Sequence, residues 1–290
     1  MVKLLNIKKI IKKIGGNKIQ NVFTSMLIKT GLNNKYILFT SKKAIPNRVN
    51  LNYCHDFKNL GDNISPVIVN YMLKKYKIDG KKNIGQTKHL YAVGSIITAG
   101  AQDCTVWGSG LLNTTILNRL NNRTIDFRCV RGPITRAILQ DRGFSVPAKF
   151  GDPAIVFPLI FNPKVEKKYP VSIITHTNEK TDIPDGDYHI INVVTDDYKK
   201  FITEVKQSEL IISSSLHGII FAEIYGIKAI MLRPQTDMLK YYDYYYSTER
   251  FEFPIAKNVS EALKIKPAEI PDFNKLQKNL IETFPIDLWN

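Results

Sequence analysis

Short apolar runs alternate with helical patterns in the first half of the chain, beginning near residue 50. The apolar runs predict strands at 51–57, 89–97, 105–107 and 126–130. The 3.6-residue periodicity predicts helices at 64–76 and 133–141, the second with a proline at its start. This alternation is typical of β-α-β units that share a mostly parallel sheet.

A second block of the same kind follows a stretch at 162–169 whose proline and lysines predict a linker. The pattern predicts strands at 171–176, 189–194, 210–213 and 228–232. It predicts helices at 197–207, 217–225, 236–246 and 272–283, the last capped by Asp272. We therefore expect an α/β protein with two Rossmann-like domains, 1–162 and 163–290, facing each other across a cleft.

Residues 3–14 form a pattern of their own, with isoleucines and a leucine on one helical face and four lysines on the other. Such a basic amphipathic helix can lie in the headgroup region of an anionic membrane. It can equally pack its isoleucines on the first domain and leave its lysines in solvent. The pattern alone does not choose between these alternatives.

Composition and charge narrow the class of protein. The 290 residues include 44% hydrophobic and 23% charged side chains, which excludes a disordered chain. The net charge of +15 favours acidic partners, but the lysines are spread along the chain and no RNP motif or zinc finger is present, which disfavours nucleic acid. Three scattered cysteines support neither a disulfide framework nor a zinc knuckle, so a reducing cytosol is expected. No apolar stretch is long enough to cross a bilayer, and lysines interrupt any secretory signal at the start.

The most informative segment runs from a buried strand through three serines into a helix. The serines and the first helical N–H groups predict an anion-binding end, formed by Ser214, Ser215, Leu216 and Gly218. His217 would stand at the mouth of the cleft, where it can give or take a proton near neutral pH. Alternatively, His217 caps or packs the helix.

Two cations are candidates for holding an anion. Arg131 occupies a turn between a strand and a helix, where its guanidinium could bind a carboxylate or phosphate with two hydrogen bonds, or form an ion pair with Asp152. Lys240 precedes a run of tyrosines and either pairs with an anion at the cleft or extends into solvent.

Three loops contain glycine beside a polar or aromatic residue at the expected ends of strands, at 59–63, 107–110 and 151–153, and the last of them carries Asp152. Asp62 could cap the following helix or accept hydrogen bonds from a ligand. Trp107 and Ser109 belong to a Trp-Gly-Ser-Gly loop, where Trp107 could offer a flat face to a sugar ring. The sequence has no P-loop, no His-Glu-x-x-His and no G-x-G-x-x-G after a strand, which disfavours an NTPase, a metalloenzyme and a dinucleotide enzyme.

Taken as a set, these segments resemble the polysaccharide pyruvyl transferase family, in particular its exopolysaccharide branch. The segments that carry the resemblance are NLGDNISPVIVNYM (59–72), VGSII (93–97), VWGSG (106–110), VRGPITRAIL (130–139), FGDPAIVFP (150–158), SSSLHGIIFAEIYGIKAI (213–230), MLKYYDYY (238–245) and TFPIDLW (283–289). Many family members carry Arg-Leu-His where this chain has Ser215-Leu216-His217, which leaves Arg131 and Lys240 with more of the anion binding.

The resemblance implies two Rossmann-like domains arranged as in GT-B glycosyltransferases, with the acceptor side in 1–162 and the donor side in 163–290. It implies transfer of pyruvate from phosphoenolpyruvate to two sugar hydroxyls as a ketal, with release of phosphate and no metal or other cofactor. The implied catalytic residues are His217 as general acid, with Asp62 or Asp152 assisting the attacking hydroxyl. The implied donor-binding residues are Arg131, Lys240, Ser214, Ser215, Leu216 and Gly218, and the implied acceptor-binding residues are Asn59, Gly61, Trp107 and Ser109.

Acceptors of this kind are often sugars on a polyprenyl diphosphate, so the basic helix at 3–14 would hold a cytoplasmic enzyme at the inner leaflet. The alternative activity is that of a GT-B nucleotide-sugar glycosyltransferase, for which Glu223 is the only acid available in its helix. A non-enzymatic alternative is a membrane-bound scaffold in polysaccharide assembly.

Overall fold

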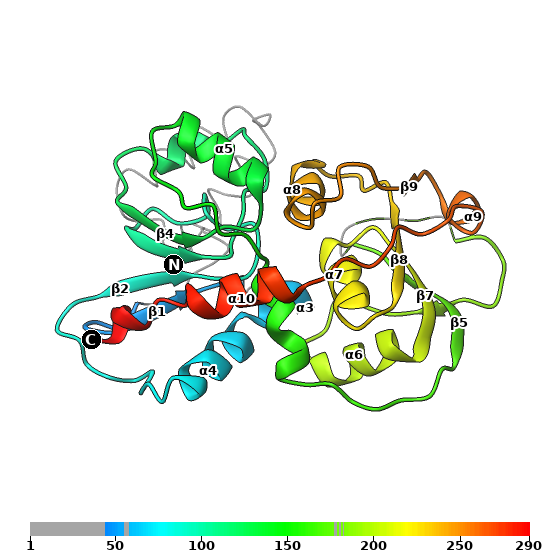
Figure 1. Cartoon of the computed structure of the whole chain (residues 1–290), viewed down its shortest axis with the longest axis horizontal. Coiled ribbons are helices and arrows are strands. Elements are labelled where there is room, and N and C mark those ends of the chain that lie inside the picture. Colours follow the sequence, from blue (N-terminus) through cyan, green and yellow to red (C-terminus); the bar gives the residue numbers. More distant parts are fainter. Residues whose placement is uncertain (1–43, 55–57, 177–178, 180, 182) are drawn as a thin grey trace, which may run out of the picture.

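The protein is an α/β chain built on two parallel sheets (Figure 1). The structure is a computed structural model and describes residues 44–54, 58–176, 179, 181 and 183–290. The basic amphipathic helix expected at 3–14 lies outside these residues. Within the described part of the chain, no helix is long and apolar enough to cross a membrane.

The first sheet has four parallel strands in chain order, β1-β2-β3-β4. These are β1 (Val49–Asn52), β2 (Lys88–Tyr91), β3 (Cys104–Trp107) and β4 (Ile125–Cys129). Helices α3 (Leu60–Asn63) and α4 (Ser65–Lys75) join β1 to β2, the 3-10 turn η1 (Leu117–Leu120) lies between β3 and β4, and α5 (Pro133–Asp141) follows β4. Proline is the first residue of α5, where its missing N–H costs no helical hydrogen bond.

The second sheet has the order β6-β5-β7-β8-β9, also parallel. Its strands are β5 (Tyr169–Ile174), β6 (His189–Ile190), β7 (Ser208–Ser213), β8 (Lys228–Leu232) and β9 (Ile255–Ala256). Its helices are α6 (Tyr198–Gln207), α7 (Leu216–Ile224), α8 (Leu239–Ser247) and α9 (Val259–Ala262). The next strand, β6, pairs with one side of β5, and the following strand, β7, pairs with its other side. Such a reversal of strand order predicts a ligand-binding crevice at the carboxyl ends of β5 and β7.

Most elements lie within about three residues of their predicted positions, and the exceptions have local causes. The strand predicted at 89–97 ends at Tyr91, because the chain turns at Gly94, whose φ is 107° and whose carbonyl accepts the N–H of Gly110. The strand predicted at 189–194 is reduced to His189–Ile190. The strand predicted at 51–57 ends at Asn52, and residues 55–57 lie outside the described part of the chain. The elements that were not predicted are α3, α9, β9 and the 3-10 segments η1, η2 (Pro153–Leu159) and η3 (Ile286–Trp289).

One apolar core runs through both sheets and the helices between them. Helix α7 is buried on every side through residues such as Ile219, Ile220 and Phe221. The same cluster includes Ile68 of α4 and Phe157 of η2. Residues 162–168 contain neither helix nor strand, as expected of a linker, and a two-domain GT-B arrangement with its boundary near 162 stays a prediction.

The C-terminal helix predicted to close the second half packs on the first. Helix α10 (Asn274–Glu282) and the 3-10 turn η3 (Ile286–Trp289), at the red end of the chain in Figure 1, contact β2, β3 and β4 of the first sheet. Trp107 Nε1 donates to the carbonyl of Leu280 at 2.9 Å, and Tyr76 Oη donates to that of Ile281 at 2.7 Å. Asp272 accepts the N–H of Asn274, the first residue of α10, close to the predicted cap.

Candidate active site

A pocket of about 420 Å³ lies where the ends of strands from both sheets approach each other. Residues that follow strands or begin helices form its polar walls. Those from the first half are Lys58, Asn59, Asp62, Ser95, Arg131 and Asp152, and those from the second half are His176, Ser215, His217 and Lys240, with Leu216 beside them. The pocket is large enough for a small-molecule substrate.

His217 is the second residue of α7, which begins at the carboxyl end of β7. Ser215 is the N-cap of α7, and its Oγ accepts the N–H of Gly218 at 3.4 Å. The imidazole rests against Gly61, where a Cβ would lie only 2.0 Å from His217 Nδ1. Glycine at position 61 is therefore what admits the ring into the pocket.

Asp152 approaches the other nitrogen of the same imidazole. Its Oδ2 is 3.7 Å from His217 Nε2, while its Oδ1 accepts the N–H of Ala154 as the N-cap of η2. Nε2 is buried and has no hydrogen-bond partner among the described residues. Burial lowers the pKa of His217 below the usual histidine value. The nearby carboxylate of Asp152 opposes this shift, and the cations Lys240 and Arg131 add to it. The imidazole of His217 is therefore mostly neutral near pH 7.

Asp62 lies on α3, which Asn59 caps through an Oδ1 that accepts the N–H of Gly61 at 3.2 Å. The amide of Asn59 also donates to Asp62 Oδ2 at 2.9 Å, so the carboxyl is held in place and caps no helix. Burial raises the pKa of Asp62 to about 7, with Asp152 adding to the rise and Lys240 opposing it. The carboxyl is thus protonated in a large fraction of molecules at neutral pH.

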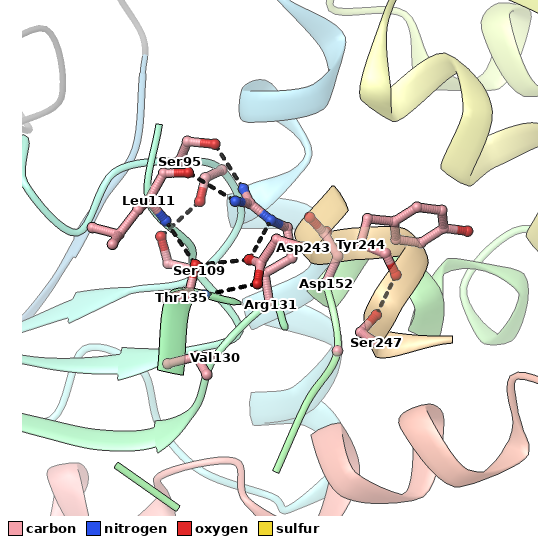
Figure 2. A network of polar contacts seen from close by, with 12 residues as sticks. Ser95, Ser109, Leu111, Val130, Arg131, Thr135, Asp152, Asp243, Tyr244 and Ser247 are labelled. Carbon is pink, nitrogen blue, oxygen red and sulfur yellow. Dashed lines mark hydrogen bonds and ion pairs between the residues drawn. The ribbon is translucent and has the colours of Figure 1, made fainter. Parts of the chain in front are cut away.

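Arg131 follows β4 and is buried, with Asp243 of α8 as its ion-pair partner (Figure 2). The expected alternative pairing with Asp152 is wrong. Its Nε donates to Asp243 Oδ2 at 3.1 Å, Nη1 donates to Ser95 Oγ at 2.7 Å and Nη2 donates to the carbonyl of Leu111 at 2.8 Å. A guanidinium has five N–H groups, so one hydrogen on each Nη remains for a ligand.

Lys240 stands one turn before Asp243 on α8, and its side chain is 7% exposed. Its ammonium is 5.0 Å from the centroid of the Tyr241 ring, and no ion pair or hydrogen bond to it occurs among the residues that the structure describes. Burial, together with Arg131, lowers the pKa of Lys240 to about 8, against the pull of Asp62 and Glu179. The ammonium is still mostly charged at pH 7 and available to an anion.

Three residues assigned to the acceptor side have other roles in the structure. Trp107 has no exposed surface and packs edge-on against Phe284 of the C-terminal segment, so it offers no face to a sugar. Ser109 is buried and donates to the carbonyl of Gly94 at 2.7 Å, which fixes one pocket loop against another. Gly61 makes room for His217, as described above.

Two residues assigned to donor binding support the pocket wall from behind. Ser214 is buried, and its Oγ accepts the N–H of His176 at 3.0 Å. Gly218 lies against β7, where a Cβ would meet Ser213 Oγ at 2.4 Å. Neither residue lines the pocket, whereas Ser215 and Leu216 do.

Asp243, Ser95 and His176 were missed by the sequence analysis. Asp243 is the one acid within the run of aromatic residues at 241–246, and that isolation was a usable signal. Ser95 was included in a strand that ends earlier, and His176 was taken as the last residue of another strand. Their roles depend on contacts between distant segments, which a one-dimensional pattern does not encode.

Comparison with known proteins gives a family for this arrangement. An uncharacterized protein of Acanthamoeba polyphaga mimivirus is 29% identical over 178 residues, or 56% of this chain. The match covers 61% of that relative, so the chain spans less than two thirds of its length. The solved structure of an uncharacterized protein from Klebsiella pneumoniae covers 77% of this chain and 94% of its own, with 14% identity and a TM-score of 0.47. Residues 56–236, more than half of the chain and most of the pocket, match the polysaccharide pyruvyl transferase family. The chain therefore belongs to this family.

Proposed function

We propose that this pocket transfers pyruvate from phosphoenolpyruvate to two hydroxyls of a polysaccharide or lipid-linked sugar as a cyclic ketal, and releases phosphate. One observation carries the proposal: Arg131 of the first half and Lys240 of the second line the same pocket as His217. The donor carries a carboxylate and a phosphate, and fixed cations from two directions are what such a small dianionic molecule requires.

The donor's negative charges have three complementary partners. Arg131 keeps one free N–H on each Nη, and Lys240 supplies an ammonium with no partner among the described residues. The N–H groups of Leu216 and His217 belong to the first turn of α7, whose positive end favours an anion. Serine at position 215 removes the cation that many relatives carry there, so the helix end and Lys240 hold the phosphate.

The pKa shifts favour a division of roles that reverses the one expected from sequence. Asp62, whose pKa is raised to about 7, is the better donor of a proton to the methylene carbon of phosphoenolpyruvate. The arriving negative charge raises that pKa further and keeps the carboxyl protonated. His217 is neutral, with an unpartnered Nε2 near Asp152, and is the better acceptor of the proton of the attacking sugar hydroxyl.

The proposed reaction balances without an oxidant or reductant. One proton adds to the methylene carbon, and a sugar oxygen bonds to the neighbouring carbon as it loses its own proton to His217. The bond from that carbon to the phosphate oxygen then breaks, its electron pair leaving with the phosphate, and the second hydroxyl closes the ring. Of the two protons lost by the hydroxyls, the new methyl group accounts for one and the released hydrogen phosphate for the other.

The residues around Glu223 disfavour the glycosyltransferase alternative. A nucleotide-sugar enzyme of this shape would use an acid in this helix to bind the ribose. Glu223 is buried, binds both Nη atoms of Arg250 at 2.7 Å and accepts the hydroxyl of Tyr244 at 2.6 Å, and it does not line the pocket. A thermal-shift panel separates the two activities, because phosphoenolpyruvate and not nucleotide sugars should raise the melting temperature.

Mass spectrometry of candidate acceptors after incubation with phosphoenolpyruvate tests the proposed function directly. The expected product gains the mass of pyruvate less one water, and one phosphate is released per product. His217→Ala and Lys240→Met should each lower this turnover by about a hundredfold or more. The absence of phosphate release with every class of acceptor, or function that survives His217→Ala, would refute the proposal and favour the scaffold.

We further propose that residues 3–14 hold the enzyme at the inner leaflet, where lipid-linked sugars reside. The proposal rests on the sequence, in which isoleucines and lysines take opposite helical faces. Deleting residues 1–16 should release the protein from vesicles that contain anionic lipid while turnover of a soluble acceptor survives. Equal vesicle binding by the full and shortened chains would refute it.

A further inference from the structure

His176 stands at the switch point of the second sheet. It follows β5 by two residues, and β5 lies between β6 and β7, where parallel sheets place their ligands. Its backbone N–H donates to Ser214 Oγ at 3.0 Å, which ties the end of β5 to the loop that begins α7. The side chain lines the same pocket as His217 and Lys240, although the proposed reaction has so far given it no role.

Part of the fixed positive charge of the pocket is already balanced within the protein. The charge of Arg131 is balanced by Asp243, which is fully buried beside it. Among the described residues that line the pocket, Lys58 pairs with Asp196, which leaves Lys240 as a buried cation without an ion-pair partner. A molecule that brings a carboxylate and a phosphate must therefore recruit protons, and His176 is a pocket group able to take one.

Among the described residues, His176 is influenced by charged or titratable groups from its own loop and from two helices. Burial and the ammonium of Lys240 on α8 lower the pKa of His176, and Glu179 of the same loop opposes them. His217 on α7 is also close enough for the two rings to influence each other. His176 is therefore mostly neutral near pH 7, and an anion placed between it and Lys240 would raise its pKa again.

We propose that His176 binds the phosphate of the donor and protonates its bridging oxygen as phosphate leaves. This assignment rests on the proposed function. In the step, the bond between the donor carbon and the bridging oxygen breaks and its electron pair goes to that oxygen, which takes the proton from the imidazolium. Hydrogen phosphate departs, His176 is left neutral, and the carbon becomes the electrophile that the second sugar hydroxyl attacks. His176 is thus distinct from His217, which receives a proton from the acceptor.

Steady-state kinetics of His176→Gln and His176→Ala test the assignment. Both variants should lose about a hundredfold in kcat, as expected for a missing general acid, with a smaller change in KM for the donor. In the wild type kcat falls as pH rises, because Asp62 and His176 both act in their protonated forms. The slope of log kcat against pH on this limb should change from about −2 to about −1 in the variants.

His189→Gln is the matched control. His189 lies on the edge strand β6, stacks on Tyr169 with 3.7 Å between ring centroids, and is outside the pocket. This variant should keep the wild-type kcat and the wild-type slope. Melting temperatures of all three variants show whether each is folded. If His176→Ala is unfolded, the comparison is made with His176→Gln.

Proton uptake on donor binding gives a second readout that needs no acceptor. Calorimetric titration of phosphoenolpyruvate in two buffers of different ionisation heat should show net proton uptake by the wild type and less by folded His176→Gln. Equal uptake, an unchanged slope or an unchanged kcat in that variant would overturn the role of His176 while the proposed function stands. A wild type that binds no phosphoenolpyruvate and makes no product would refute the proposed function, and the role of His176 with it.

Discussion

The buried ion pair between Arg131 and Asp243 provides a prediction whose size follows from the structure. Asp243 has no exposed surface and Arg131 is 1% exposed, and the carboxylate also accepts the N–H and hydroxyl of Thr135 at 2.8 and 2.7 Å. Asp243→Asn keeps the shape of the side chain but removes the charge and turns an amide toward groups that donate. An uncompensated charge in such a place costs about 3–5 kcal/mol of unfolding free energy.

The matched control is Asp287→Asn, which weakens the more exposed pair of Asp287 with Arg128. Those side chains are 50% and 33% exposed, so solvent screens the interaction and the expected loss is about 1 kcal/mol or less. Urea denaturation measures both free energies. At about 2–4 °C per kcal/mol, the melting temperature should fall by roughly 6–20 °C for Asp243→Asn and by a few degrees at most for the control.

A double variant separates the charge from the packing. Replacing the pair by apolar residues, as in Arg131→Met with Asp243→Leu, should recover much of the lost stability, because no unpaired charge remains. The same double variant should still lack donor binding, since the guanidinium is gone. Equal, small losses for Asp243→Asn and Asp287→Asn would refute the view that this pair is a buried anchor of the pocket.

Three further variants test other parts of the site. Gly61→Ala should displace the His217 ring, because the new Cβ would lie 2.0 Å from Nδ1, and should lower kcat by about a hundredfold with little change in KM for the donor. In the wild type, kcat/KM for the donor should fall as pH rises through about 8, because Lys240, whose pKa is lowered to about 8, loses its charge there. In Lys240→Met this decline should be absent, and the decline near pH 7 that follows loss of the Asp62 proton should remain. Trp107→Ala should cost about 3–5 kcal/mol of stability by urea denaturation, yet leave KM for the acceptor unchanged in the folded fraction, whereas a raised KM would restore the sugar-stacking role.

The sequence pattern was sufficient for the class of fold and for most of the pocket's charged groups. Parallel α/β units have strands and helices of characteristic period, and their loops at the carboxyl ends carry the ligand-binding residues. Arg131 lies between a strand and the helix that follows it, and His217 lies in the first turn of such a helix, so their position along the chain already indicated the pocket.

Contacts between distant segments could not be predicted in this way. Trp107 ends a short strand that is buried on both faces, and one of those faces is covered by the chain around Leu280 and Phe284. The residues near Trp107 in the sequence give no indication that the C-terminal segment packs on this strand. The pairing of Arg131 with Asp243 likewise joins residues 112 positions apart, so Asp152, the nearer acid, was the natural but wrong choice.

Diffraction from crystals grown with phosphoenolpyruvate and no acceptor tests the central claim most directly, because the donor cannot be consumed. The account predicts the donor in the pocket between Arg131 and Lys240, with its phosphate over the first turn of α7 and within reach of His176. A donor bound in another part of the molecule, or a pocket that stays empty at saturating phosphoenolpyruvate, would contradict it.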